Sequence, residues 1–499
     1  MEYEELKNQT SARETPPDTG EFSPERLRGA GFLIRELLAE KNKDAKETLE
    51  ALDERVSNCL DVVERGLSEE DYWHRSLTLL NELAKNPTSE RTKSFGGAME
   101  ILERNLALLQ KRVEHVSPAA KKDMFHSALF LVWYGTEAAR NEGVLFLEKN
   151  LFAVEDAMTK AWSGEKYLPF LETVIAYGAD EKKEQALGVI RNQIRMVPAH
   201  IMASCLISIR PEVRNVAEEE FKKMAEPYSI PWETLLRAWK ASTSSTDFGN
   251  VLLRNFISID QLEKHQKGLP KFLYETFGVL NFSRYPIELL VNQAAEYENT
   301  RLPYGVIFNP RDDYNGAFYD NRRIYNDLIN QLENRFLVRA AEGESKIDIV
   351  KMLNRLNNKY GGEHKISFAI VGGHGTKDSI QFGGDDKKHV LRTEDLKERI
   401  SGRKKNRAER GGYFEEGATL ILNSCSTGYE EGIGQELSRI LGIKTVTVIA
   451  PDRDAPLKTI TVTIKDGRPQ FGVTYLEGES TRFASGKKIT NQSPLPPSS

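Results

Sequence analysis

Two short apolar runs in the second half of the chain constrain its fold more than any other feature. Residues 366–371 read Ile-Ser-Phe-Ala-Ile-Val, and residues 418–422 read Ala-Thr-Leu-Ile-Leu. Both runs are rich in β-branched or aromatic residues and are short enough to form strands buried on both faces. Further strand patterns alternate with helical ones around them. The alternation predicts an α/β domain with a mostly parallel sheet over residues 299–484.

Each of the two runs leads into a chemically reactive side chain. The first is followed by Gly-Gly-His-Gly, which contains His374, and the second by Asn-Ser-Cys-Ser-Thr-Gly, which contains Cys425. In an open parallel sheet, functional groups collect at the carboxyl ends of the strands. If the two strands are neighbours, an imidazole acid/base and a thiol nucleophile emerge side by side. The alternatives are a buried structural cysteine and an ordinary loop histidine.

The two motifs, in this order and spacing, resemble those of the caspase-like cysteine peptidases, which include caspases, metacaspases, gingipains, legumains and separases. In these proteins one apolar strand ends in His-Gly, and a later one ends just before a cysteine. Residues 423–428 also resemble the metacaspase pattern Asp-x-Cys-x-Ser-Gly, with Asn423 in place of Asp and Thr427 in place of Ser. The resemblance covers residues 300–476 and does not extend to the first 300.

The resemblance implies peptide-bond hydrolysis by a dyad of Cys425 and His374. It also implies that the backbone N–H groups of Gly375 and Cys425 hold the oxyanion, since such donors must face the developing charge. No metal or organic cofactor is required for this chemistry. A helix that starts near residues 432–434 is expected to lower the thiol pKa through its amino terminus. The sequence assigns no third residue to orient the imidazole.

Substrate preference depends in this family on a pocket built partly after the first strand. The segment Asn-Asp-Leu centred on Asp327 resembles the metacaspase Asn-Asp-Ala/Val, which makes Asp327 the candidate for binding Arg or Lys. Asp312 and Asp313 are alternatives in the preceding loop. Arg322 and Arg323 would suit an acidic substrate residue instead. We expect cleavage after a basic residue.

The first half of the chain is helical in pattern over residues 23–298. Residues 210–221 resemble the second helix of a HEAT repeat, in which an acidic residue, Val-Arg and then Ala recur. We therefore expect a HEAT-like helical domain that binds a protein partner or regulator, with an irregular helical bundle as the alternative. Residues 1–22 are predicted to be a disordered amino terminus, and residues 485–499 a flexible tail.

Composition bears on location and partners. The net charge is −5, without a basic stripe, so no nucleic acid is expected to bind. The three cysteines are scattered and odd in number, which favours a reducing compartment. The first residues lack a basic, apolar leader, and no apolar run approaches the roughly 18 residues that span a bilayer. We expect a cytoplasmic protein without membrane contact.

These observations predict a cytoplasmic caspase-like cysteine endopeptidase that acts on a protein substrate and is controlled by its helical half. A catalytically inactive caspase-like scaffold is the alternative. A third hypothesis treats residues 372–375 as a phosphate-binding loop, but the glycine spacing of known phosphate loops is missing. The basic residues 401–410 form a solvated charge run or a self-cleavage segment.

Overall fold

The computed structural model describes nine ranges of the chain, and they divide into two compact units. The described residues are 22–40, 46–85, 93–160, 164–196, 198–332, 334–384, 386–402, 412–441 and 445–489. The first unit comprises residues 1–197 and 204–217, and the second comprises 198–203 and 218–499. Almost all of the proposed self-cleavage segment, and nearly all of the predicted disordered amino terminus, lie outside the described residues.

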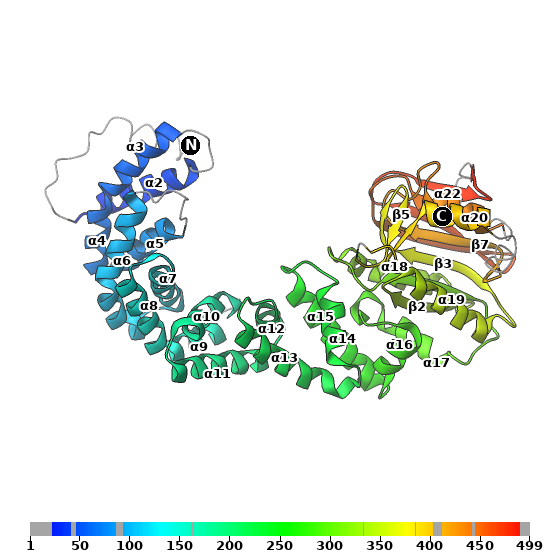
Figure 1. Cartoon of the computed structure of the whole chain (residues 1–499), viewed down its shortest axis with the longest axis horizontal. Helices are drawn as coiled ribbons and strands as arrows, with labels where there is room; N and C mark the ends of the chain where they lie inside the picture. Colours follow the sequence, from blue (N-terminus) through cyan, green and yellow to red (C-terminus); the bar gives the residue numbers. More distant parts are fainter. Residues whose placement is uncertain are drawn as a thin grey trace, which may run out of the picture. The chain divides into compact units, whose positions relative to one another are not determined.

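The first unit is built from α-helices that pack mainly on helices close to them in the chain (Figure 1). Local signals start several of them. The Ser117 side chain accepts the N–H of Ala120 and caps one helix, and Thr136 caps the next by accepting the N–H of Ala139. The helices are α2 (Pro24–Glu40), α3 (Lys46–Ser57), α4 (Leu60–Ser68), α5 (Trp73–Ala84), α6 (Lys93–Arg112), α7 (Pro118–Tyr134), α8 (Glu137–Lys149), α9 (Leu151–Lys160), α10 (Leu168–Tyr177) and α11 (Asp180–Met196). The prediction of a helical amino-terminal half is confirmed.

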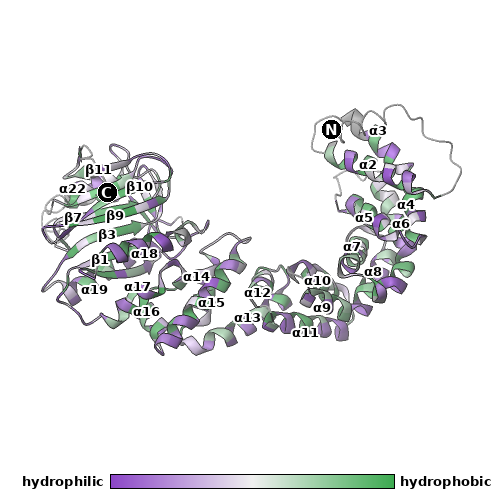
Figure 2. Ribbon diagram, turned by 180° about the vertical axis from the view of Figure 1, so that it is seen from behind, coloured by the Kyte–Doolittle hydropathy of each residue, from purple (hydrophilic) through white to green (hydrophobic). Residues whose placement is uncertain are grey.

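Hydrophobic and hydrophilic residues alternate along the helices of this unit, as the mixed colouring of the ribbons shows (Figure 2). Close packing depends on small residues at some crossings. A Cβ atom at Gly143 of α8 would lie 2.7 Å from the Ala128 carbonyl oxygen of α7. Glycine therefore allows α7 and α8 to approach backbone to backbone.

The second unit joins a helical segment to a sheet. The division between the units falls within α12 (Pro198–Leu206) and α13 (Pro211–Ala225). The helices that follow are α14 (Trp232–Lys240), α15 (Phe248–His265), α16 (Leu269–Phe277), the short 3-10 helix η4 (Phe282–Arg284) and α17 (Ile287–Ala295).

The sheet has seven strands in the order β12-β11-β8-β7-β3-β1-β2. Strands β2, β1, β3, β7 and β8 are parallel, whereas β11 and β12 run antiparallel to their neighbours. The bounds are β1 (Tyr304–Pro310), β2 (Leu337–Gly343), β3 (Ile366–Gly372), β7 (Phe414–Asn423), β8 (Thr447–Pro451), β11 (Ser480–Ala484) and β12 (Lys487–Ile489). The prediction of a mostly parallel sheet is confirmed.

Smaller elements complete the unit. Helices η5 (Ala317–Asn321) and α18 (Arg322–Gln331) connect β1 to β2, and α19 (Lys346–Tyr360) connects β2 to β3. A three-stranded sheet of β4 (His374–Thr376), β5 (Ser379–Gln381) and β6 (Val390–Arg392) follows β3, and then α20 (Thr393–Gly402). Helix α22 (Ile433–Ile440) follows β7, and the hairpin of β9 (Leu457–Lys465) and β10 (Arg468–Tyr475) follows β8.

The direction of the chain across the sheet reverses at β2. The path from β1 to β2 runs one way, and the path from β2 past β1 to β3, β7 and β8 runs the other. Parallel crossovers are right-handed, so such a reversal places the connections before and after it on opposite faces. The crevice between the carboxyl ends of β1 and β3 is where ligands bind in sheets of this kind.

The helices end and the strands begin near residue 298, where the domain boundary is predicted, but the compact units divide elsewhere. Residues 218–298 belong to the compact unit that holds the sheet, because they cover its β2 edge. Gln293 of α17 donates to the Ala340 carbonyl (3.0 Å) and accepts the Ala340 N–H (2.6 Å). Arg339 of β2, which is buried, donates to the Glu296 carbonyl at 2.8 Å. An edge strand presents unpaired backbone groups, and here the helical segment satisfies some of them.

The predicted tail starts too early. Strand β12 lies within the range 485–499 and pairs with β11 through Ala484 and Lys487, among other residues. Regular structure is therefore present up to Ile489, and residues 490–499 lie outside the described part of the chain. In the described ranges, no helix has both the length and the apolar content that a bilayer crossing requires.

Candidate active site

His374 and Cys425 emerge at the same edge of the sheet. Strands β3 and β7 are parallel neighbours, and their last paired residues are Gly372 and Asn423. His374 and Cys425 each lie two positions beyond that pair. The condition on which the dyad hypothesis depends, that the two strands are adjacent and end together, is therefore met.

The backbones of the two loops are in direct contact. A Cβ atom at Gly375 would lie 2.3 Å from the Cys425 carbonyl oxygen and 2.8 Å from the Cys425 nitrogen. Only glycine fits there, because a methyl group would overlap backbone atoms that cannot move independently. The Cys425 N–H donates to no backbone carbonyl of the described residues. The two predicted oxyanion donors, Gly375 and Cys425, are thus adjacent.

The turn after β7 has a special backbone conformation. Ser426, directly after the cysteine, has a φ of 57°, in the left-handed region that non-glycine residues rarely adopt. Its N–H donates to the Arg453 carbonyl at 2.8 Å, and the Gly428 N–H donates to the Pro451 carbonyl at 2.7 Å. The loop after β8 therefore holds the turn in place, and Cys425 remains half-buried at its tip.

The expected lowering of the thiol pKa is wrong. Burial raises the pKa of Cys425 to about 12, helped by a hydrogen bond to the Asp454 carboxylate and by its charge. The first N–H groups of α22 do not reach the sulfur. Ile433 donates to the Lys377 carbonyl at 2.8 Å, and Gly434 to the Thr427 carbonyl at 3.1 Å. The helix amino terminus thus fastens the loops and does not offset the rise in the thiol pKa.

The imidazole of His374 lies over a buried carboxylate. Its Nε2 atom is 3.3 Å from Asp313 Oδ1, close enough for an ion pair, although Nε2 has no hydrogen bond in this geometry. The ring contacts Tyr314 at 4.2 Å between centroids and Phe318 edge-on at 5.6 Å. These contacts come from the loop after β1. The sequence predicts substrate binding by Asp312 or Asp313 in this loop, and in the structure Asp313 and its neighbours contact the imidazole.

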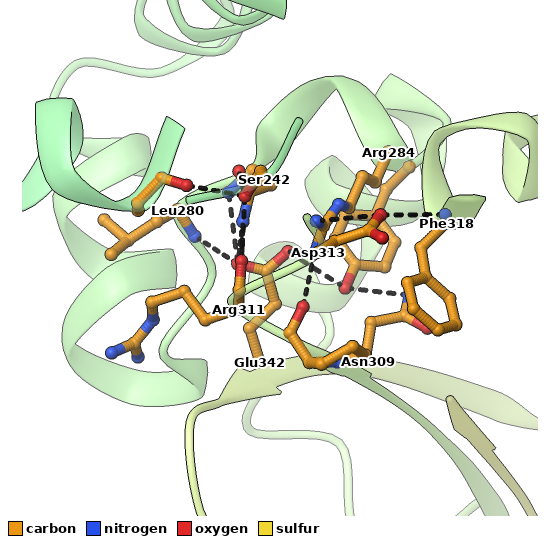
Figure 3. A network of polar contacts seen from close by, with 12 residues as sticks. Ser242, Leu280, Arg284, Asn309, Arg311, Asp313, Phe318 and Glu342 are labelled. Carbon is orange, nitrogen blue, oxygen red and sulfur yellow. Dashed lines mark hydrogen bonds and ion pairs between the residues drawn. The ribbon is translucent and has the colours of Figure 1, made fainter. Parts of the chain in front are cut away.

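Asp313 therefore does not have the predicted substrate-binding role. Its side chain is fully buried, and both oxygens are occupied. Oδ2 accepts the Phe318 N–H at 2.9 Å and lies 3.4 Å from Arg284 Nη2, while Oδ1 accepts the Ala317 N–H at 3.2 Å. Figure 3 shows Arg284, Asp313 and Phe318 meeting in this network. A carboxylate of this kind cannot reach a substrate side chain.

Asp312 and Asp327, the other candidates for the substrate pocket, lie near residues other than His374 and Cys425. Their role in substrate binding stays a prediction. Asp312 is half-buried near Arg311 and Glu344, and burial, followed by the Glu344 charge, raises its pKa. Asp327 is exposed on α18 and lines a shallow surface hollow with residues of β9, among them Lys458. Asn423, at the metacaspase Asp position, is buried beside Tyr325.

In the described ranges, no three His, Cys, Asp or Glu side chains gather as metal ligands do. A comparison of the chain with models of protein families, with curated proteins and with solved structures found no match.

Proposed function

We propose that the chain is a caspase-like cysteine endopeptidase in which Cys425 is the nucleophile and His374 the general acid and base. The observation that carries the proposal is the contact between the Gly375 and Cys425 backbones at the ends of adjacent parallel strands. It brings a thiol, an imidazole and two N–H donors to one edge of the sheet. Acyl transfer requires these groups together.

The reaction follows from the positions of these groups. His374 takes the proton of the Cys425 thiol, and the thiolate attacks the carbonyl carbon of the scissile peptide bond. The N–H groups of Gly375 and Cys425 donate to the oxyanion that forms. The C–N bond then breaks, and His374 protonates the leaving amine. Water, deprotonated by His374, hydrolyses the thioester and regenerates the thiol.

We also propose that the helical half is a HEAT-like domain that binds a protein partner. Consecutive helices pair through short turns, and similar contacts recur along the first unit. Glu148 of α8 accepts the Ala179 N–H in the turn before α11, and Thr136, in the turn before α8, donates to Glu103 of α6. Such stacking forms an extended surface without chemistry of its own.

Cleavage of a peptide library by the wild-type chain and by Cys425→Ala tests the activity. The wild type is expected to cleave after Arg or Lys, and Cys425→Ala to lose cleavage completely. His374→Ala should lose it as well. No cleavage by the wild type, or equal cleavage by Cys425→Ala, would contradict the proposal.

The second candidate function, an inactive scaffold of the same fold, is favoured by one observation. The Cys425 thiol is hydrogen-bonded to a carboxylate, and its raised pKa leaves little thiolate at neutral pH. Labelling with iodoacetamide, read by mass, separates the two functions. In a scaffold Cys425 reacts no faster than Cys59 or the fully buried Cys205, whereas in a peptidase it reacts first.

A further inference from the structure

A cluster of buried charged side chains, Arg284, Asp313 and Glu342, lies next to His374. Arg284 is fully buried, and its guanidinium lies 3.4 Å from Asp313 and 3.5 Å from Glu342. It also donates to the Pro310 carbonyl and lies over the Tyr319 ring at 4.8 Å. All these partners belong to the second unit. The guanidinium therefore ties η4, the end of β1 and the end of β2 into one structure.

The two carboxylates of this cluster have different neighbours. Glu342 accepts the N–H groups of Leu280 (2.9 Å) and Asn281 (3.1 Å), so it fastens the helical segment to β2 (Figure 3). Asp313 accepts the N–H groups of Ala317 and Phe318. Of the two carboxylates, Asp313 is the one that lies at ion-pair distance from His374. Both side chains are inaccessible to solvent.

The charges of the cluster do not balance without the histidine. With both carboxylates ionised, Arg284 offsets one of them, and one negative charge remains in a fully buried place. Unpaired buried charge is unfavourable. The imidazolium that forms when His374 accepts the thiol proton lies next to that charge and neutralises it.

We infer that Asp313 is the positioning residue of His374, and that Arg284 holds it there from the helical segment. This inference rests on the proposed function and names a residue that a Cys/His dyad does not include. Asp313 Oδ1 lies 3.3 Å from Nε2, at ion-pair distance though without a hydrogen bond in this geometry, and the contacts with Tyr314 and Phe318 fix the plane of the imidazole ring. Nδ1 is thereby left as the nitrogen available to the Cys425 thiol. Residues 218–298 are then part of the catalytic apparatus as well as of the fold.

The wild-type chain provides the first test, which does not depend on activity or on any variant. Long-range nitrogen–proton NMR correlations identify which ring nitrogen of His374 carries the hydrogen when the ring is neutral. The inference requires the hydrogen on Nε2, facing Asp313. A hydrogen found on Nδ1 overturns it, whether or not the chain is a peptidase.

Asp313→Asn and the matched control Glu342→Gln provide the second test. Both variants remove one carboxylate from Arg284, but only the first changes the partner of His374. Asp313→Asn is expected to give a mixture of His374 tautomers and to lower kcat on a peptide cleaved by the wild type by about 10²–10⁴-fold, with little change in KM. Glu342→Gln should keep the wild-type tautomer and a kcat within about tenfold of the wild type.

Equal effects of the two substitutions on tautomer and kcat would show that Asp313 serves only as a structural partner of Arg284. If the wild type cleaves no peptide, the proposed function fails, and the tautomer measurement still decides the role of Asp313. If Asp313→Asn does not fold, the wild-type tautomer alone decides it.

Discussion

At the scale of single residues, the candidate nucleophile is restrained by a neighbouring carboxylate. Burial and Asp454 both raise the pKa of the Cys425 thiol, to about 12. A negative charge beside the sulfur disfavours the thiolate, so Asp454 opposes the chemistry that His374 would assist. The loop that carries Asp454 also holds the turn after Cys425 through the Arg453 carbonyl. One loop thus shapes the site and raises the pKa of its thiol.

Asp454→Asn should make Cys425 more reactive. Removal of the carboxylate charge lowers the thiol pKa, and each unit of lowering multiplies the thiolate fraction tenfold. We expect iodoacetamide to label Cys425 about tenfold faster at pH 8 in Asp454→Asn than in the wild type. In the wild type, the labelling rate should still rise with pH at about pH 10, since the thiol pKa lies above that value.

Asp452→Asn is the control, because that carboxylate accepts the Glu479 N–H at 2.8 Å and is not among the groups that raise the thiol pKa. Its labelling rate should equal that of the wild type. Equal rates in Asp454→Asn and the wild type would show that Asp454 does not restrain the sulfur.

At the scale of elements, the site depends on how closely the loops after β3 and β7 approach each other. The two strands end together, and the backbones of Gly375 and Cys425 touch. Helix crossings in the first unit depend on the same kind of contact, as at Gly143 between α7 and α8. Where an added side chain would overlap backbone atoms, the two elements must move apart, and the packing energy of their whole contact is reduced.

Gly375→Ala should separate the two loops. The added methyl group would lie 2.3 Å from the Cys425 carbonyl oxygen, so the loops must move apart. We expect a loss of about 1–3 kcal/mol of unfolding free energy, measured in urea, together with loss of peptide cleavage. Gly384→Ala is the matched control after β5, since no atom lies within 4 Å of a Cβ there. An unchanged stability in Gly375→Ala would contradict the close contact.

A pair of helical glycines tests the packing of the first unit. Gly143→Ala should destabilise it by about 1–3 kcal/mol, because the methyl group would meet the Ala128 carbonyl of α7. Gly188→Ala in α11 meets no atom within 4 Å and should stabilise by up to about 1 kcal/mol, through the higher helix propensity of alanine. Opposite shifts of the thermal midpoint in the two variants are the expected result, and shifts of the same sign would contradict it.

At the scale of the whole molecule, the two compact units divide near residue 217 and not at residue 298. Residues 218–298 supply Arg284 to the buried cluster, and Gln293 and the Glu296 carbonyl to the β2 edge. Without them, Asp313 and Glu342 would lose their cation, and β2 would expose its backbone. The helical segment thus stabilises the sheet and positions the site.

Two fragments of the chain test this division. Residues 198–499 should fold with a cooperative urea transition, whereas residues 299–499 should not. Removal of Arg284 alone leaves two buried carboxylates unpaired, which costs about 3–5 kcal/mol, a large part of the stability of a typical domain. Near-ultraviolet circular dichroism and urea unfolding measure the difference. A cooperative transition in residues 299–499 would place the domain boundary at residue 298, as the sequence predicts.

Much of the site could be predicted because it depends on local pattern. Apolar runs too short for helices become strands, and a parallel sheet brings strand ends to one edge, so His374 and Cys425 could be paired from the sequence. The helical character of residues 23–298 follows in the same way from periodicity. The role of Asp313 could not be predicted, because an acidic residue in a loop has the same appearance whether it faces solvent or a buried arginine.

The sequence by itself determined which segments form helices and strands, and it determined that an imidazole and a thiol follow two buried strands. Only the tertiary structure decided the electrostatics and the boundaries. It placed Arg284, remote in sequence, against Asp313 and Glu342, turned Asp454 toward the sulfur, and joined residues 218–298 to the sheet. The physical reason is that patterning acts between near neighbours in the chain, whereas burial and charge depend on whatever segments folding brings together.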